Sequence, residues 1–114
     1  MEETSEQARL CRLHGVPLVP SLPGQRVGIA KNVLEGLQTL NGLRHPPSGE
    51  STGWYIWAGE VLCSADDFFT PLHVAHLDEW CPEVVRFLGL PPGWRFLVAG
   101  ALEDVWFDPA LLGA

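Results

Sequence analysis

Basic residues are scarce in this chain. Lysine and arginine together number 7 against 14 aspartate and glutamate residues, which gives a formal net charge of -7. Ten of the fourteen acids lie in residues 45–114, where Arg86 and Arg95 are the only lysine or arginine residues. Such an excess of negative charge repels phosphate backbones, so we expect no direct nucleic-acid binding. The same field would attract a basic protein partner, although a solubilising surface charge explains it equally well.

Cysteine and long apolar runs are also in short supply. The three cysteines, Cys11, Cys63 and Cys81, form no Cys-x-x-Cys motif, which excludes the usual redox and zinc-knuckle signatures. No apolar run approaches the ~18 residues that span a membrane. The acidic start of the chain, residues 1–7, is unlike a signal peptide. We therefore expect a cytoplasmic protein with free thiols and no membrane contact.

Recognised cofactor and metal motifs are missing as well. The glycines form neither a phosphate-binding loop nor a dinucleotide fingerprint. His73 and His76 have an i, i+3 spacing, and Asp78, Glu79 or Cys81 could join them as metal ligands. Zinc needs three or four ligands, and nothing completes the set at a recognised spacing. We expect no cofactor, no metal and no catalytic residue.

A cysteine beside a histidine is the other candidate for catalysis. Cys63 or Cys81 with His73 or His76 would make a thiolate nucleophile pair. The context of Cys81 is more typical of a small buried residue. Adjacent carboxylates at 66–67, 78–79 and 103–104 would point to opposite faces of a strand, which favours solvated surface acids over a catalytic pair.

Proline and glycine, by contrast, are abundant. Ten prolines and twelve glycines predict short elements and many turns. Three aromatic segments flanked by acids, at 53–60, 93–100 and 103–108, have the composition of strands. The predicted fold is α+β, with residues 1–114 as one domain: an antiparallel sheet of about four strands with two or three short helices on one face. Residues 1–25 should form an N-terminal helix and a proline-rich extended segment.

Two local predictions depend on glycine and proline residues that mark turns and helix starts. The dipeptides Asn-Gly, Pro-Pro and Ser-Gly predict that residues 41–52 form a loop. Thr70 followed by Pro71 has the form of a helix start, so we expect a helix from Pro71 to about Trp80. The other expected elements are a helix over 2–14, a strand near 26–30, irregular or helical structure to residue 40, a strand over 54–58, a short helix over 82–88, a hairpin at 100–102 and a terminal turn that buries Leu111 and Leu112.

The predicted strand over 54–58 carries aromatic side chains on both faces. Alternation places Trp54, Ile56 and Ala58 on one face and Tyr55 and Trp57 on the other. Such a strand is either covered on both sides or exposes an aromatic patch.

Acidic and aromatic residues stand side by side in the predicted strands. Arg95 has acidic neighbours there, and we expect it to form an ion pair across the sheet with Glu60, Glu103 or Asp104. Aromatic side chains rimmed by charge have the composition of protein-binding hot spots. The predicted partner-binding residues are Tyr55, Trp57, Glu60, Asp66, Asp67, Glu103, Asp104, Trp106 and Asp108.

The stretch from Thr52 to Glu60, Thr-Gly-Trp-Tyr-Ile-Trp-Ala-Gly-Glu, resembles immunity protein family thirty-three of bacteria. The upstream segment Ala30–Leu34 is similar to a short segment of that family, so the resemblance covers residues 26–60. The second half of the chain looks like a distinct extension. The resemblance implies a small cytoplasmic antitoxin that binds a cognate polymorphic or type VI secretion toxin and blocks it sterically. An acidic surface would suit a basic toxin, such as a nuclease, and the antitoxin would be a monomer or weak homodimer.

Two alternatives from other classes remain open. The first is a small metal-dependent or thiol hydrolase that uses His73 and His76 with nearby acids or Cys81. The second is a non-catalytic subunit of a constitutive complex.

Overall fold

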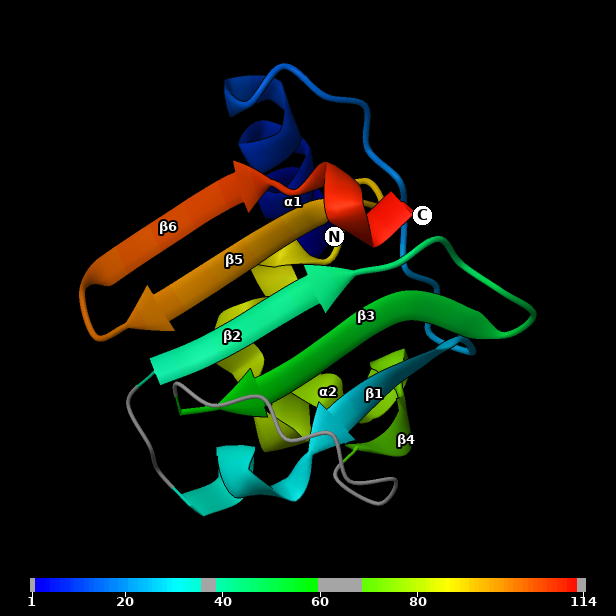
Figure 1. The fold of residues 1–114 in the computed structure, drawn as a ribbon, viewed down its shortest axis with the longest axis vertical. Helices are drawn as coiled ribbons and strands as arrows, with labels where there is room; N and C mark the ends of the chain where they lie inside the picture. The colour runs from blue at the N-terminus through cyan, green and yellow to red at the C-terminus, as the bar shows by residue number, and fades with distance from the viewer. Residues whose placement is uncertain (1, 36–38, 60–68, 113–114) are drawn as a thin grey trace.

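The described residues form one six-stranded sheet with helices packed against it (Figure 1). The computed structural model describes residues 2–35, 39–59 and 69–112. The strand order is β4-β1-β3-β2-β5-β6. The bounds of the strands are β1 Arg26–Ala30, β2 Thr39–Arg44, β3 Ser51–Ala58, β4 Phe69–His73, β5 Trp94–Ala99 and β6 Leu102–Phe107. The helices are α1 Glu2–Leu13 and α2 Leu77–Trp80, with 3₁₀ helices η1 Lys31–Glu35, η2 Val74–His76, η3 Pro82–Phe87 and η4 Pro109–Leu112.

The α+β class is confirmed, but the predicted sheet was too small and too uniform. Six strands replace the expected four, and β1 pairs with β3 in parallel while the other pairings are antiparallel. The two strands that the sequence reading missed are β2 and β4. The sequence predicts a loop at β2, because of Asn41-Gly42 and the turn signals after it, and a helix start at β4, because of Thr70-Pro71.

Strand β2 occupies part of the predicted loop over residues 41–52. Asn41-Gly42, which looked like a turn, lies inside β2 and pairs with β3 on one side and β5 on the other. A Cβ atom at Gly42 would lie 2.1 Å from the Phe96 ring, so the glycine makes room for that ring. A glycine within a strand commonly marks such a close approach.

Strand β4 replaces the start of the predicted helix over residues 71–80. Pro71 does not begin a helix; it lies in β4 opposite Gly28 of β1. Strand β4 is at one edge of the sheet, which is where a proline is tolerated. Only the short helices η2 and α2 remain of the expected helix, followed by η3.

Helices α1, α2 and η3 lie behind the sheet in Figure 1, and the main core fills the space between them and the strands. Trp54, Ile56 and Ala58 of β3 point into this core, with exposed fractions of 2% or less. Tyr55 and Trp57 lie on the opposite face, which we call the open face, in a smaller cluster with Ala30, Leu43, Phe69 and Leu111. The predicted alternation of β3 is therefore confirmed, and the strand is covered on both sides.

Several turn predictions are also confirmed. Helix α1 ends at Leu13, and Gly15 follows with a φ of 69°. Strands β5 and β6 form a hairpin whose turn contains Gly100 at a φ of 61°, where an L side chain would be strained. At the C-terminal turn only half of the expectation is correct, because Leu111 is buried while Leu112 is 47% exposed.

Arg44, at the end of β2, is a fully buried guanidinium. Its Nε donates to the Thr52 carbonyl at 2.8 Å, and its Nη1 donates to the carbonyls of Val19 at 2.8 Å and Leu90 at 2.7 Å. No carboxylate pairs with it in the described part of the chain. Burial lowers the pKa of Arg44 to about 10, so the side chain stays charged at neutral pH.

We predict that Arg44→Ala lowers the free energy of unfolding by about 3 kcal/mol, because several buried carbonyls lose their donor at once. The matched control is Arg26→Ala, which removes an exposed arginine and its ion pair with Glu50. The control should cost less than about 1 kcal/mol. Urea unfolding followed by tryptophan fluorescence measures both. Equal losses in the two variants would show that Arg44 does not tie the fold together.

Candidate functional site

The structure separates the residues that were predicted to form one binding surface. Tyr55 and Trp57 lie on β3, and Glu103, Asp104 and Trp106 lie on β6, with Asp108 directly after it. Three further members of the predicted set lie outside the described residues; they are Glu60, Asp66 and Asp67. Two strands, β2 and β5, stand between β3 and β6, so the described members form two separate groups.

Trp57 is 3% exposed, contrary to the expectation of a surface ring. Phe69 of β4 packs edge-on against it with ring centroids 6.3 Å apart. Leu111, from the C-terminal turn η4, joins the same cluster. Because the ring is buried in a cluster with side chains from other strands, Trp57 belongs to the core of the open face rather than to its surface.

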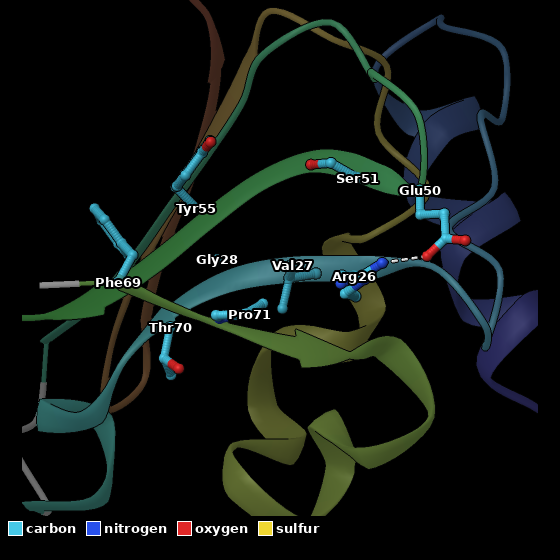
Figure 2. Close-up of a pocket in the computed structure, with 9 residues that line it drawn as sticks. All are labelled: Arg26, Val27, Gly28, Glu50, Ser51, Tyr55, Phe69, Thr70 and Pro71. Carbon is cyan, nitrogen blue, oxygen red and sulfur yellow. Dashed lines mark hydrogen bonds and ion pairs between the residues drawn. The ribbon is translucent and has the colours of Figure 1, made fainter. Parts of the chain in front are cut away.

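Tyr55 lines a shallow groove of about 380 Å³ on the open face (Figure 2). Its ring stands beside the Phe69 ring, edge to face at 5.2 Å, and both project to the same side of the sheet. Gly28 of β1 lies beside them, where a Cβ atom would meet the Tyr55 ring at 2.8 Å. At the other end of the groove, Arg26 and Glu50 form an exposed ion pair. Both charges are compensated there, so the groove has no net preference for a charged partner.

The second group lies in the β5–β6 hairpin. Its side chains point to both faces of the sheet, because successive residues of a strand alternate between faces. Asp104 and Trp106 lie on the open face, whereas Glu103 points to the helix side and forms an ion pair with Arg86 of η3. Asp104 forms no ion pair with any described residue. Two apolar side chains are exposed at the ends of β6, Leu102 at 62% and Phe107 at 45%.

Arg95 pairs with Asp108 rather than with Glu103 or Asp104, and the third expected partner, Glu60, lies outside the described residues. The Nη1 of Arg95 bonds the Oδ2 of Asp108 at 3.1 Å, and its guanidinium lies 5.4 Å from the centre of the Trp106 ring. Arg95 is directly opposite Trp106 on the open face, while Glu103 points to the other face. The three residues Arg95, Trp106 and Asp108 thus form a partly buried cluster at one end of the hairpin.

The acids do not gather on a single face. Glu79 and Glu103 pair with His76 and Arg86 on the helix side, and Glu50 pairs with Arg26 on the open face. Among the described acids of the second half, only Asp78 and Asp104 lack both an ion pair and a thiol neighbour. The described acids therefore form no continuous acidic face: the two unpaired ones lie far apart in the fold, Asp78 on α2 and Asp104 in the hairpin.

The geometry gives little support to a metal site. His73 is the last residue of β4 and His76 the last of η2, and their ring centroids are 6.3 Å apart. His76 Nδ1 lies 3.7 Å from the Oε2 of Glu79, an exposed contact. Within residues 2–35, 39–59 and 69–112, no group of three or more histidine, cysteine, aspartate or glutamate side chains could hold a metal ion.

The thiols are placed for packing rather than for nucleophilic attack. Cys81 is 2% exposed, and burial raises its pKa to about 12, with the nearby Glu83 carboxylate adding to the shift. Cys11 is equally buried, its Sγ donates to the Gly89 carbonyl at 3.3 Å, and burial raises its pKa too. Cys63 lies outside the described residues. A thiol that stays protonated at neutral pH is a poor nucleophile.

Comparison with known proteins gives one match. The family model described as "Imm33-like domain" matches residues 6–108. No curated protein matches the chain, and no solved structure matches it. None of the described helices is both long enough and apolar enough to cross a membrane.

We predict that Cys11 and Cys81 react slowly with a thiol reagent at pH 8, roughly a hundredfold more slowly in the folded protein than in urea, because labelling requires local opening. A Cys63→Ser background leaves only these two thiols to be labelled. Reaction with an aromatic disulfide reagent, followed by absorbance, measures the rate. Fast labelling of Cys81 in the folded protein would contradict this prediction and would make Cys81 a candidate nucleophile again.

We also predict a specific pH dependence of stability. The pKa of Cys81 is raised in the folded protein above its ordinary value of 9.0, to about 12. The folded state therefore holds this proton more tightly, and the resulting stability is present below pH 9 and is lost as the pH rises toward 12. The difference in unfolding free energy between wild type and Cys81→Ala should shrink from pH 8 to pH 10.5. A constant difference would contradict the shift.

Proposed function

The chain belongs to the Imm33-like family, and from this membership we propose that it is an immunity protein that binds a cognate bacterial toxin and neutralises it by protein–protein contact. We place this activity in the cytoplasm, where a toxin of a polymorphic or type VI secretion system would act. The observation that carries the proposal is the family match across residues 6–108.

The extent of that match bears on the β5–β6 hairpin. The resemblance visible in the sequence covered residues 26–60 alone, and the second half had looked like a separate extension. The family match instead includes β5 and β6. The hairpin is therefore part of the family's domain, and we consider it as a surface for binding the toxin.

The composition of the hairpin suits recognition of a basic protein. Leu102 and Phe107 expose apolar surface, and the unpaired Asp104 stands between them. Trp106 adds an aromatic ring already held by the Arg95 guanidinium. Aromatic and apolar anchors with a charged rim are the usual anatomy of protein interfaces. The net charge of -7 would steer a basic toxin toward this protein from a distance.

Inhibition by this route is steric. The hairpin occupies or covers a surface that the toxin needs, and the immunity protein supplies no reactive group. The grooves and thiols described above need no catalytic role under this proposal. The hydrolase alternative has no supporting observation, since the described histidines and thiols are placed unfavourably for metal binding and nucleophilic attack.

We predict that co-expression of this chain relieves the toxicity of the product of the adjacent gene. Growth of a host that carries both genes, compared with a host that carries the adjacent gene alone, measures the protection. If the adjacent product is harmless alone, or remains toxic despite abundant soluble immunity protein, the proposal is wrong.

A second prediction concerns the charge of the hairpin. Asp104→Lys should slow association with the purified toxin by about tenfold at low salt, and the effect should fade as salt is raised. Glu79→Lys makes the same change of charge on α2 behind the sheet and should have a much smaller effect. Biolayer interferometry at two salt concentrations measures both variants. Equal slowing by both would mean that net charge matters and the hairpin does not.

A further inference from the structure

The described sheet ends in two edge strands, β4 and β6. An edge strand presents backbone N–H and C=O groups that can pair with a strand of another chain, and proteins protect such edges with proline or charge. The direction in which each backbone group points follows from the hydrogen-bond phase of the ladder. The two edges of this sheet differ in whether each residue that points outward has a backbone N–H to offer.

Strand β4 is protected by Pro71. The bond from Val74 N–H to the Gln25 carbonyl, 2.9 Å, joins directly opposite residues and so fixes the phase of the β1–β4 ladder. In an antiparallel ladder every second pair of opposite residues is hydrogen-bonded, so from Gln25–Val74 the bonded pairs alternate with unbonded ones. Gly28 and Pro71 form one of the unbonded pairs. The nitrogen of Pro71 therefore points away from β1, toward the outer edge, and carries no hydrogen to offer an added strand.

Strand β6 has no proline to protect it. The bond from Asp108 N–H to the Gly93 carbonyl, 2.7 Å, fixes the phase of the β5–β6 ladder. Counting from it, Glu103, Val105 and Phe107 are the residues whose backbone groups point away from β5. None of the three is a proline, and no described strand pairs with this edge. Three N–H groups and three C=O groups are thus available in register.

The edge of β6 also has a shelf beside it. A hollow of about 310 Å³ on the helix side is lined by Glu6, Arg9, Leu10 and Leu13 of α1 together with Arg86 and Glu103. Leu13 is 77% exposed. At the other end of β6, His14 contacts Trp94, which in turn contacts Phe107. A strand added to β6 would have one face over α1 and would bury apolar side chains that are now exposed.

We infer that the toxin supplies an extended strand that pairs with the outer edge of β6 and continues the sheet. This inference rests on the proposed immunity function and states how the partner is held. Alternation fixes the chemistry of the added strand. A lysine or arginine faces Asp104 on the open side, because that carboxylate has no partner among the described residues, and apolar side chains face Phe107 and Leu13 on the helix side.

Amide hydrogen exchange tests this pairing directly. We compare the free protein with its purified complex with the product of the adjacent gene, following single amides by NMR. The amides of Glu103, Val105 and Phe107 should exchange at least tenfold more slowly in the complex. Those of Asp104 and Trp106, which already bond to β5, should change much less. This alternation distinguishes an added strand from a partner that merely covers the hairpin, which would slow all five amides.

A pair of proline variants gives a second test. Val105→Pro removes an outward N–H and leaves the bonds to β5 in place, so it should weaken toxin binding at least tenfold. His73→Pro removes an outward N–H from the β4 edge, at a residue whose φ of -64° already suits proline, and should leave binding unchanged. Circular dichroism checks that both variants are folded. If Val105→Pro fails to fold, the exchange experiment on the wild-type protein decides.

The outcomes separate the two proposals. A complex that forms without slowed exchange at Glu103, Val105 and Phe107 overturns the added strand and leaves the immunity function standing. The absence of any complex overturns both. Slowed exchange in the free protein that increases with its concentration would assign the edge to a second copy of this chain, and it would overturn the pairing with the toxin.

Discussion

The fold depends on a single buried guanidinium. Arg44 bonds carbonyls of the proline-rich segment, of β3 and of the turn that follows η3, through Val19, Thr52 and Leu90. A buried charge is tolerated only when hydrogen bonds replace the water it has lost. Two of these carbonyls, those of Val19 and Leu90, belong to segments with little regular structure of their own, and loss of Arg44 would remove their donor. Arg44 therefore fixes the irregular segments against the sheet and meets its own desolvation cost by the same bonds.

The same interaction explains how a domain with so many prolines keeps one arrangement. The segment from Val16 to Gln25 contains no described strand or helix. It is held by Arg44 at Val19 and by a backbone bond from Val19 N–H to the Gly89 carbonyl, 2.8 Å. The Leu88 carbonyl next to it accepts from the indole of Trp54, so the aromatic strand β3 joins the same network.

The two edge strands of the described sheet differ in how they are protected against pairing with another chain. Pro71 closes β4 to intermolecular pairing, which is the usual defence of an edge strand. Strand β6 has charged side chains instead, Glu103 and Asp104, which discourage pairing with most strands but favour one that carries positive charge. An edge strand protected only by negative charge can therefore select a partner strand by that strand's charge. Under the proposed function that property is useful, because such a protein must accept one partner and refuse others.

By itself, the sequence determined the features that arise from neighbouring residues: the α+β class, the alternation of β3, the hairpin at Gly100 and the end of α1 before Gly15. It also contained the family signature around Gly53–Glu60.

Tertiary structure decided the rest. Gly42 looked like a turn residue because the Phe96 ring that it accommodates is 54 residues away, and Pro71 looked like a helix start because its partner strand β1 lies far upstream. Trp57 looked like a binding residue because Phe69, which packs against it, and the other members of its cluster are contributed by other segments. The buried role of Arg44 and the open edge of β6 likewise depend on contacts between remote strands. Local patterns specify which conformation a segment prefers, whereas burial, ion pairing and edge exposure are properties of the packed sheet.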